Sequence, residues 1–212
     1  MKISEILFGP KTKSISRIIE KGNLDELNNF ITNGGDVNKI YDDKSLLHYA
    51  IDNCGENYFQ VIELLINNGA DINSTQSYYK ELPLHRACAR IRPQMDVIKL
   101  LLERGSKVNI ENITGKTPIF NCNFSFSVEL LNLLLKYGAD IKHTDKYDNT
   151  ILHDDYIMCG DPYDFEEYLK VILSLGVDIN SKNNEGKTPL NLCKDRKIEN
   201  ILIQYGAKTI IN

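Results

Sequence analysis

Three of the four histidines and one cysteine are the side chains best suited to chemistry in this chain of 212 residues. His48, His85 and His153 each follow a leucine, in the stretches SLLHYA, LPLHRA and TILHDD. Three imidazoles could bind a zinc ion. His85 and Cys88, three residues apart, could serve as base and nucleophile on one helix. Both chemistries depend on the elements that carry these residues.

The stretches around the histidines belong to an internal repeat. Related stretches follow at 117–122 (TPIFNC) and 188–193 (TPLNLC), and an apolar run ends in a glycine six times, at steps of 30–38 residues. The closing glycines are Gly34, Gly69, Gly105, Gly138, Gly176 and Gly206. A period of this size predicts a repeat architecture.

The two motifs resemble the ankyrin repeat, in which T-P-L-H-x-A begins the first helix of a unit and G-A-D-x-N follows the second. The resemblance extends over about residues 14–208. It implies an all-α repeat solenoid of stacked helix pairs with β-hairpin-like fingers. Because two short helices cannot bury both of their faces alone, neighbouring units must stack.

Physical chemistry supports these assignments. Prolines suit a first helical position, where the missing N–H costs nothing. Hydroxyls suit N-caps, and glycine suits the left-handed residue after a helix. The expected first-position prolines are Pro83, Pro118 and Pro189, and the expected N-caps are Ser45, Thr117, Thr150 and Thr188.

The repeats predict one ankyrin-repeat domain over residues 1–212. Residues 14–38 are expected to form an N-terminal cap pair, and residues 181–212 a C-terminal cap repeat. The full repeats are expected at 39–73, 74–109, 110–142 and 143–180.

The repeat also argues against a metal site and against catalysis. Equivalent residues of stacked helices lie about 8–10 Å apart, whereas zinc ligands lie about 2 Å from one ion. Each histidine is therefore expected to bond to the hairpin or cap hydroxyl of its own repeat. Cys88 is expected to be buried and inert. No phosphate-binding glycine motif occurs, so we expect no enzyme, no catalytic residue, no metal and no cofactor.

Composition narrows the partner and the compartment. A net charge of −4 gives no global cationic field for nucleic acid. No apolar run is long enough to span a membrane, and the first ten residues make a poor signal peptide. Five dispersed cysteines favour reduced thiols. These features predict a cytoplasmic protein that is a monomer on its own and binds neither nucleic acid nor membrane.

The resemblance implies that partners bind to the fingertips and the inner helices, so the residues at these positions form the first candidate surface. Tyrosines at the fingertips would give large, rigid contacts, although they could instead pack between fingers and stiffen them. The predicted partner-binding residues are Tyr41, Tyr78, Tyr79, Arg90, Ile113, Phe124, Tyr147 and Met158.

An acidic insertion in the fourth repeat is the second candidate surface. It is either a solvated loop or a surface that captures a basic protein by charge and aromatic contacts; its spacing does not match a calcium loop. Its predicted residues are Asp154, Asp155, Asp161, Tyr163, Asp164, Glu166 and Glu167.

Three functions follow. The favoured hypothesis is a non-catalytic adaptor or host-directed effector that binds a folded protein through the concave ankyrin face, in a host cytosol if it is an effector. The alternative is a bacterial immunity protein or antitoxin that neutralises a basic toxin, such as a nuclease, through the acidic insertion. A distant third is an enzyme with a cryptic site at His85 and Cys88.

Overall fold

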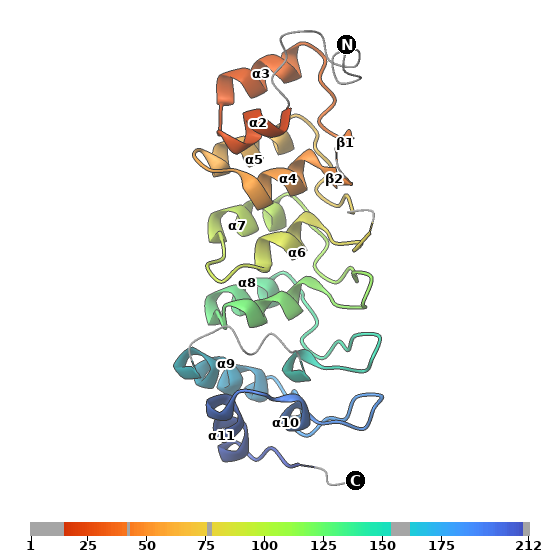
Figure 1. Ribbon diagram of the computed structural model, residues 1–212, viewed down its shortest axis with the longest axis vertical. Coiled ribbons are helices and arrows are strands. Elements are labelled where there is room, and N and C mark those ends of the chain that lie inside the picture. The colour runs from red at the N-terminus through yellow and green to blue at the C-terminus, as the bar shows by residue number, and fades with distance from the viewer. Residues whose placement is uncertain (1–14, 42, 76–77, 154–161, 210–212) are drawn as a thin grey trace. The chain divides into compact units, whose positions relative to one another are not determined.

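The computed structural model describes residues 15–41, 43–75, 78–153 and 162–209. It divides into two compact units, residues 1–77 and 78–212. Each unit consists of short helices that pack in pairs and are joined by tight turns (Figure 1). The predicted all-α arrangement of helix pairs is confirmed within each unit.

The N-terminal unit contains two helix pairs and a small finger. The strands β1 and β2 pair antiparallel, with Ile40 opposite Ser45. Its elements are α2 (Ile15–Glu20), α3 (Leu24–Thr32), β1 (Ile40–Tyr41), β2 (Lys44–Ser45), α4 (Leu46–Asn53) and α5 (Tyr58–Asn67).

The C-terminal unit continues the pattern, with first helices of six, seven, three and four residues. Its elements are α6 (Pro83–Cys88), α7 (Met95–Glu103), η1 (Pro118–Phe124), α8 (Val128–Lys136), η2 (Ile151–His153), α9 (Pro162–Ser174), α10 (Pro189–Leu192) and α11 (Arg196–Gln204). The segments η1 and η2 are 3-10 helices. In η1, Asn121 and Asn123 have low helix propensity, and their side chains bond to His85 O and Ile151 O in the flanking repeats.

The core repeats with the sequence. Four positions before each of five closing glycines, the side chain is completely buried. These residues are Leu65, Leu101, Leu134, Ile172 and Leu202. One face of each second helix is therefore committed to packing between repeats, which leaves the fingers and turns to carry other tasks.

Glycine is required at two kinds of position. Gly138 has φ +87° and ends α8, where its N–H donates to Leu135 O and the N–H of Ala139 donates to Leu134 O. Gly115 has φ +85° in a finger, and a Cβ there would lie 2.7 Å from the backbone nitrogen of Lys146. The first kind ends helices, and the second lets two fingers approach.

The expected N-caps are correct only in part. Ser45 caps α4 by accepting the N–H of His48. Thr188 occupies the N-cap position of α10, and its hydroxyl lies within hydrogen-bonding distance of Asn191 Oδ1 and Lys208 O. Thr117 occupies the N-cap position of η1 as predicted, but its buried hydroxyl makes no hydrogen bond. The motif histidine that would face it is replaced by Phe120, which offers no polar atom.

Candidate protein-binding surface

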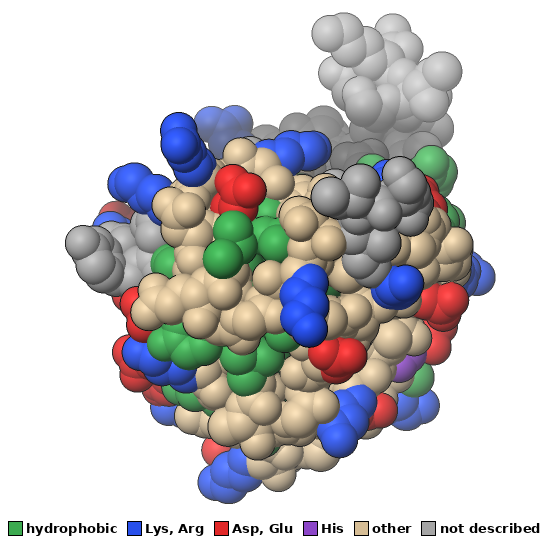
Figure 2. Space-filling model, turned by 90° about the horizontal axis from the view of Figure 1, so that it is seen from below, with side chains coloured by type: hydrophobic (Ala, Val, Ile, Leu, Met, Phe, Trp, Pro, Cys, Tyr) green, Lys and Arg blue, Asp and Glu red, His purple; other side chains and the backbone are tan. Residues whose placement is uncertain are grey.

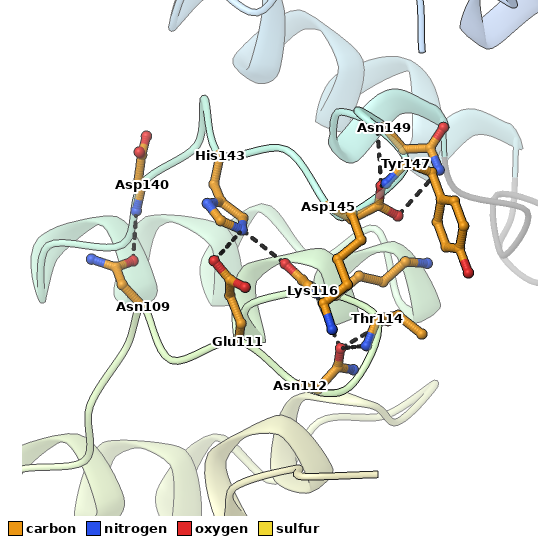
Figure 3. Close-up of polar contacts among 12 residues, drawn as sticks. Asn109, Glu111, Asn112, Thr114, Lys116, Asp140, His143, Asp145, Tyr147 and Asn149 are labelled. Carbon is orange, nitrogen blue, oxygen red and sulfur yellow. Dashed lines mark hydrogen bonds and ion pairs between the residues drawn. The ribbon is translucent and has the colours of Figure 1, made fainter. Parts of the chain in front are cut away.

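Three fingers of the C-terminal unit are each closed by one side-chain oxygen. Asn112 Oδ1 accepts the N–H groups of Thr114 (2.9 Å) and Lys116 (3.1 Å). Asp145 Oδ1 accepts those of Tyr147 (2.8 Å) and Asn149 (3.0 Å), as Figure 3 shows. Such Asx turns fix the backbone of a tip without help from the side chains that project from it.

The third of these fingers repeats the arrangement. Asn183 Oδ1 accepts the N–H groups of Glu185 and Lys187, both at 3.0 Å. The residue three positions after the closing side chain has positive φ in all three fingers. These residues are Gly115, Asp148 and Gly186. The three tips therefore share one backbone design.

Backbone hydrogen bonds join each finger to the one before it. The N–H of Ile113 donates to Tyr79 O (2.8 Å), that of Lys146 to Thr114 O (3.1 Å), and that of Asn184 to Tyr147 O (2.9 Å). Four successive fingers thus form one connected row, and along the chain they precede α6, η1, η2 and α10 (Figure 1). A side chain on any tip is held at a fixed place relative to those on the neighbouring tips.

The motif histidines support this row. His85 Nδ1 accepts the N–H of Leu82 (3.1 Å), so the proton must sit on Nε2, which donates to Lys116 O (3.1 Å). His153 is bonded likewise, to Thr150 through Nδ1 and to Lys187 O through Nε2. Burial lowers the pKa of His153. The expected bond to the cap hydroxyl of the same repeat is confirmed for His48 and His153; the bonds to the next finger were not foreseen.

Where the motif histidine is missing, another histidine supports the finger. The ring of Phe120 packs edge-on against His143, with centroids 6.0 Å apart. His143 Nε2 donates to Gly115 O at 2.8 Å and lies 3.8 Å from Glu111 Oε1. Figure 3 shows His143 and Glu111 on facing segments.

Asparagine side chains link the ends of successive repeats by hydrogen bonds. Asn109 Nδ2 donates to Gly138 O (2.9 Å), and its Oδ1 accepts the N–H of Asp140 (3.0 Å; Figure 3). Asn180 makes the same two bonds to Gly206 O and to the N–H of Lys208. One side-chain amide thus satisfies the carbonyl of a closing glycine and a backbone N–H two residues further on.

The tips of this row expose large apolar side chains. The exposed fractions are 70% for Tyr78, 55% for Tyr79, 40% for Ile113 and 54% for Tyr147. We call these four residues the fingertip row. The rings of Tyr78 and Tyr79 contact each other edge-on at 4.8 Å. Because backbone bonds hold the fingers together, these side chains are not needed to stiffen them, and they remain available for a partner.

The other residues of the first predicted surface are spread more widely. Arg90 is half-buried after α6, with Nη1 3.2 Å from Gln94 Oε1, and Phe124 is half-buried at the end of η1. Tyr41 belongs to β1, but its side chain lies outside the described part of the structure, as does all of Met158. The assignment of these residues to a partner stays a prediction.

The acidic insertion is described only at its end. Asp154, Asp155 and Asp161 lie outside the described residues, as does the side chain of Tyr163. Asp164 and Glu167 are exposed on α9.

Glu166 is engaged within the chain. Its Oε1 lies 2.9 Å from Lys170 Nζ and accepts the hydroxyl of Tyr205 at 2.8 Å, and these bonds lower the pKa of Glu166. It therefore helps to join α9 to α11.

The predicted absence of a His–Cys dyad agrees with the contacts of its two members. Both ring nitrogens of His85 are bonded to the backbone, at Leu82 and Lys116. Cys88 is completely buried, and this burial raises the pKa of its thiol. A thiol held protonated is a poor nucleophile.

Basic and acidic side chains are interspersed on the face shown in Figure 2, with small groups of hydrophobic side chains between them. Within the described residues, no three His, Cys, Asp or Glu side chains are grouped so as to hold a metal ion. None of the described helices has both the length and the apolar character needed to cross a bilayer.

Comparisons with known proteins agree with this architecture. A family model for ankyrin repeats, in three copies, matches residues 15–112. An ankyrin repeat protein of Acanthamoeba polyphaga mimivirus is 29% identical over 202 residues, which are 86% of this chain and 27% of the viral protein. An ankyrin repeat protein of Variola virus is 35% identical over 133 residues, 59% of this chain and 23% of that protein.

A human relative has similar coverage. Ankyrin repeat and SOCS box protein 16 is 30% identical over 128 residues, 60% of this chain and 26% of the human protein. The chain thus spans about a quarter of the length of each of these three relatives. The matches confirm the predicted class, an all-α repeat solenoid.

Proposed function

Because the chain belongs to the ankyrin-repeat family, we propose that it is a non-catalytic module that binds a folded protein partner through the fingertip row of its C-terminal unit. Ankyrin repeats are protein-interaction modules. The observation that carries the proposal is the connected row of tips that exposes Tyr78, Tyr79, Ile113 and Tyr147.

The physical basis is rigidity combined with exposure. Each tip is closed by a side-chain oxygen and tied to its neighbour by a backbone bond, as at Asp145 and Tyr147. A partner therefore pays no ordering entropy for the backbone of the site. Tyrosine has few rotatable bonds and a large surface, which makes it frequent in interface hot spots.

The narrower role we propose is that of an adaptor or host-directed effector in a cytoplasm. Two of the three relatives named above are proteins of viruses, which supports action on a host protein. The dispersed cysteines support a reducing compartment, since Cys54, Cys88, Cys122 and Cys193 are free thiols in the described part of the chain.

Affinity capture followed by mass spectrometry tests the proposal. The wild type is compared with a variant in which Tyr78, Tyr79 and Tyr147 are all replaced by alanine. Tyr137→Ala is the matched control, because Tyr137 is an exposed tyrosine of the same unit at the end of α8. We expect a partner that the triple variant loses and the control keeps.

Two results would count against the proposal. If the triple variant, folded by circular dichroism, retains every partner of the wild type, the fingertip row is not the binding surface. If a basic toxin is captured and is lost only after Asp164→Asn and Glu167→Gln, the inhibitor hypothesis replaces the adaptor.

A further inference from the structure

The backbone bonds between the fingers limit the spacing of the fingertip row. Tyr79 O accepts the N–H of Ile113, whose neighbour Thr114 is the next acceptor. Thr114 O accepts the N–H of Lys146, whose neighbour Tyr147 is the acceptor after that. Cα atoms paired across backbone hydrogen bonds lie about 5.5 Å apart, and adjacent Cα atoms lie about 3.8 Å apart. Each step from finger to finger, at Tyr79, Thr114 and Tyr147, is therefore at most about 9 Å.

A step of this length matches one regular conformation of a partner segment. A polyproline II helix has three residues per turn and rises about 3.1 Å per residue, so one of its faces recurs about every 9 Å. An α-helix repeats a face after seven residues, at about 10.5 Å, and would be out of step by about 3 Å over two fingers. A β-strand covers a similar length in three residues but then presents its opposite face.

The hydroxyl groups of the row complement a polyproline II segment. Within the described residues, the hydroxyls of Tyr78, Tyr79 and Tyr147 make no hydrogen bond. Figure 3 shows the hydroxyl of Tyr147 directed away from Asp145, which closes its finger. Polyproline II has no internal hydrogen bonds, so its carbonyl oxygens are open to such donors. Its prolines have no N–H group that would need an acceptor.

The charges of the fingers favour an uncharged segment. The four fingers carry four lysines and four acidic residues, so their net charge is zero. They are residues 78–81, 112–116, 145–149 and 183–187. Glu185 lies 2.6 Å from Lys187, and Lys146 Nζ donates to Ile113 O at 2.7 Å. The fingers therefore present no net field that would select a charged ligand.

From the spacing, the donors and the charge balance, we infer that the fingertip row binds a proline-rich segment of its partner in the polyproline II conformation. Successive turns of the segment contact the tips at Tyr79, Ile113 and Tyr147. Aromatic surfaces recognise such segments because the segment is ordered before binding and loses little entropy. The inference rests on the proposed function, since it names the kind of segment that the same row binds.

Fluorescence anisotropy of labelled, end-capped peptides with the full chain tests the inference. The probe is decaproline, and a glycine–serine decapeptide is its flexible counterpart. Proline peptides of four and seven residues test the spacing, and an amphipathic helical peptide with leucine at every seventh position represents the helical alternative. The variants are Tyr147→Ala and Tyr147→Phe. Tyr137→Ala is the matched control, because Tyr137 is an exposed tyrosine of the same unit outside the row.

We expect decaproline to bind the wild type and the glycine–serine peptide not to bind. Affinity should rise severalfold from four to seven prolines, because seven residues span the two turns from Tyr79 to Tyr147. Tyr147→Ala should weaken binding at least about fivefold, and Tyr147→Phe about threefold through loss of one hydrogen bond. Tyr137→Ala should change nothing. Because the probe is uncharged, its affinity should be nearly equal at about 0.1 M and about 1 M salt.

Several results would overturn the inference. They are failure of the wild type to bind decaproline, equal binding of the glycine–serine peptide, and equal losses for Tyr147→Ala and Tyr137→Ala. Tighter binding of the leucine peptide through Tyr147 would assign the row to a helix.

The inference and the proposed function fail separately. If capture of a partner depends on the tyrosines but decaproline does not bind, the inference falls and the proposed function stands. If decaproline binding depends on Tyr147 but the triple tyrosine variant keeps every captured partner, the proposed function falls.

Discussion

Replacement of Asp145 tests the central element of the candidate surface, the finger closed by a side-chain oxygen. Asp145 is buried and accepts three hydrogen bonds, from the N–H groups of Tyr147 and Asn149 and from Asn149 Nδ2. The equivalent residues of the two flanking fingers, Asn112 and Asn183, are asparagines. The chain itself therefore suggests the matched control, Asp145→Asn.

The magnitude follows from the number of bonds. Asp145→Ala removes all three, and at a net value of about 1 kcal/mol each the free energy of unfolding should fall by about 3 kcal/mol. Asp145→Asn keeps the two backbone bonds to Oδ1 and loses the third, so it should cost about 1 kcal/mol. For an m-value of about 2 kcal/mol per molar urea, the unfolding midpoints should shift by about 1.5 M and about 0.5 M.

Urea unfolding followed by circular dichroism measures both shifts, and hydrogen exchange locates them. The amides of Tyr147 and Asn149 should lose protection in Asp145→Ala and keep it in Asp145→Asn. An unchanged midpoint for Asp145→Ala would refute the role of the side chain in closing the finger. Equal destabilisation by both variants would show that the carboxylate charge matters and the shared geometry does not.

Three more outcomes are expected. Thr117→Val should raise the free energy of unfolding by about 1 kcal/mol, because it removes a buried hydroxyl without a partner. Thr150→Val, which breaks the bond to His153, should lower it. The denaturation midpoints of the two variants should therefore shift from that of the wild type in opposite directions, and shifts in the same direction would contradict the argument. Burial lowers the pKa of His153 from 6.5, so as the pH falls the unfolded chain binds a proton at this side chain before the folded chain does. The contribution of His153 to stability should therefore be constant above pH 6.5 and fall as the pH drops below it. Thermal melts should show that the melting temperature of His153→Gln falls less steeply with decreasing pH than that of the wild type. Gly138→Ala should cost about 1–2 kcal/mol, since φ is +87°, and an unchanged melting temperature would argue against a left-handed requirement there.

Much of the fold could be predicted from the sequence because its signals repeat. Leu101 and Leu134 precede their closing glycines by the same four residues, and both are buried as the period requires. The exposure of Tyr78 and Tyr147 could be inferred for the same reason, since their positions are fixed by the phase of the repeat.

The repeat could not predict features that depend on single substitutions or on contacts between neighbouring repeats. The orphan hydroxyl of Thr117 follows from an exchange of histidine for Phe120, whose effect depends on neighbours. The closing role of Asn112 and Asp145 was missed, although each lies five residues before a motif threonine. That spacing was the available signal.

The separation of backbone and side-chain tasks in the fingers has an evolutionary consequence. The tips at Tyr79, Ile113 and Tyr147 are positioned by their own backbone N–H and C=O groups. Mutation of these side chains should therefore change what the surface recognises while changing the stability of the fold little. Lineages can therefore explore new targets by drifting at a few codons, and a laboratory library randomised at the same positions should yield mostly folded members.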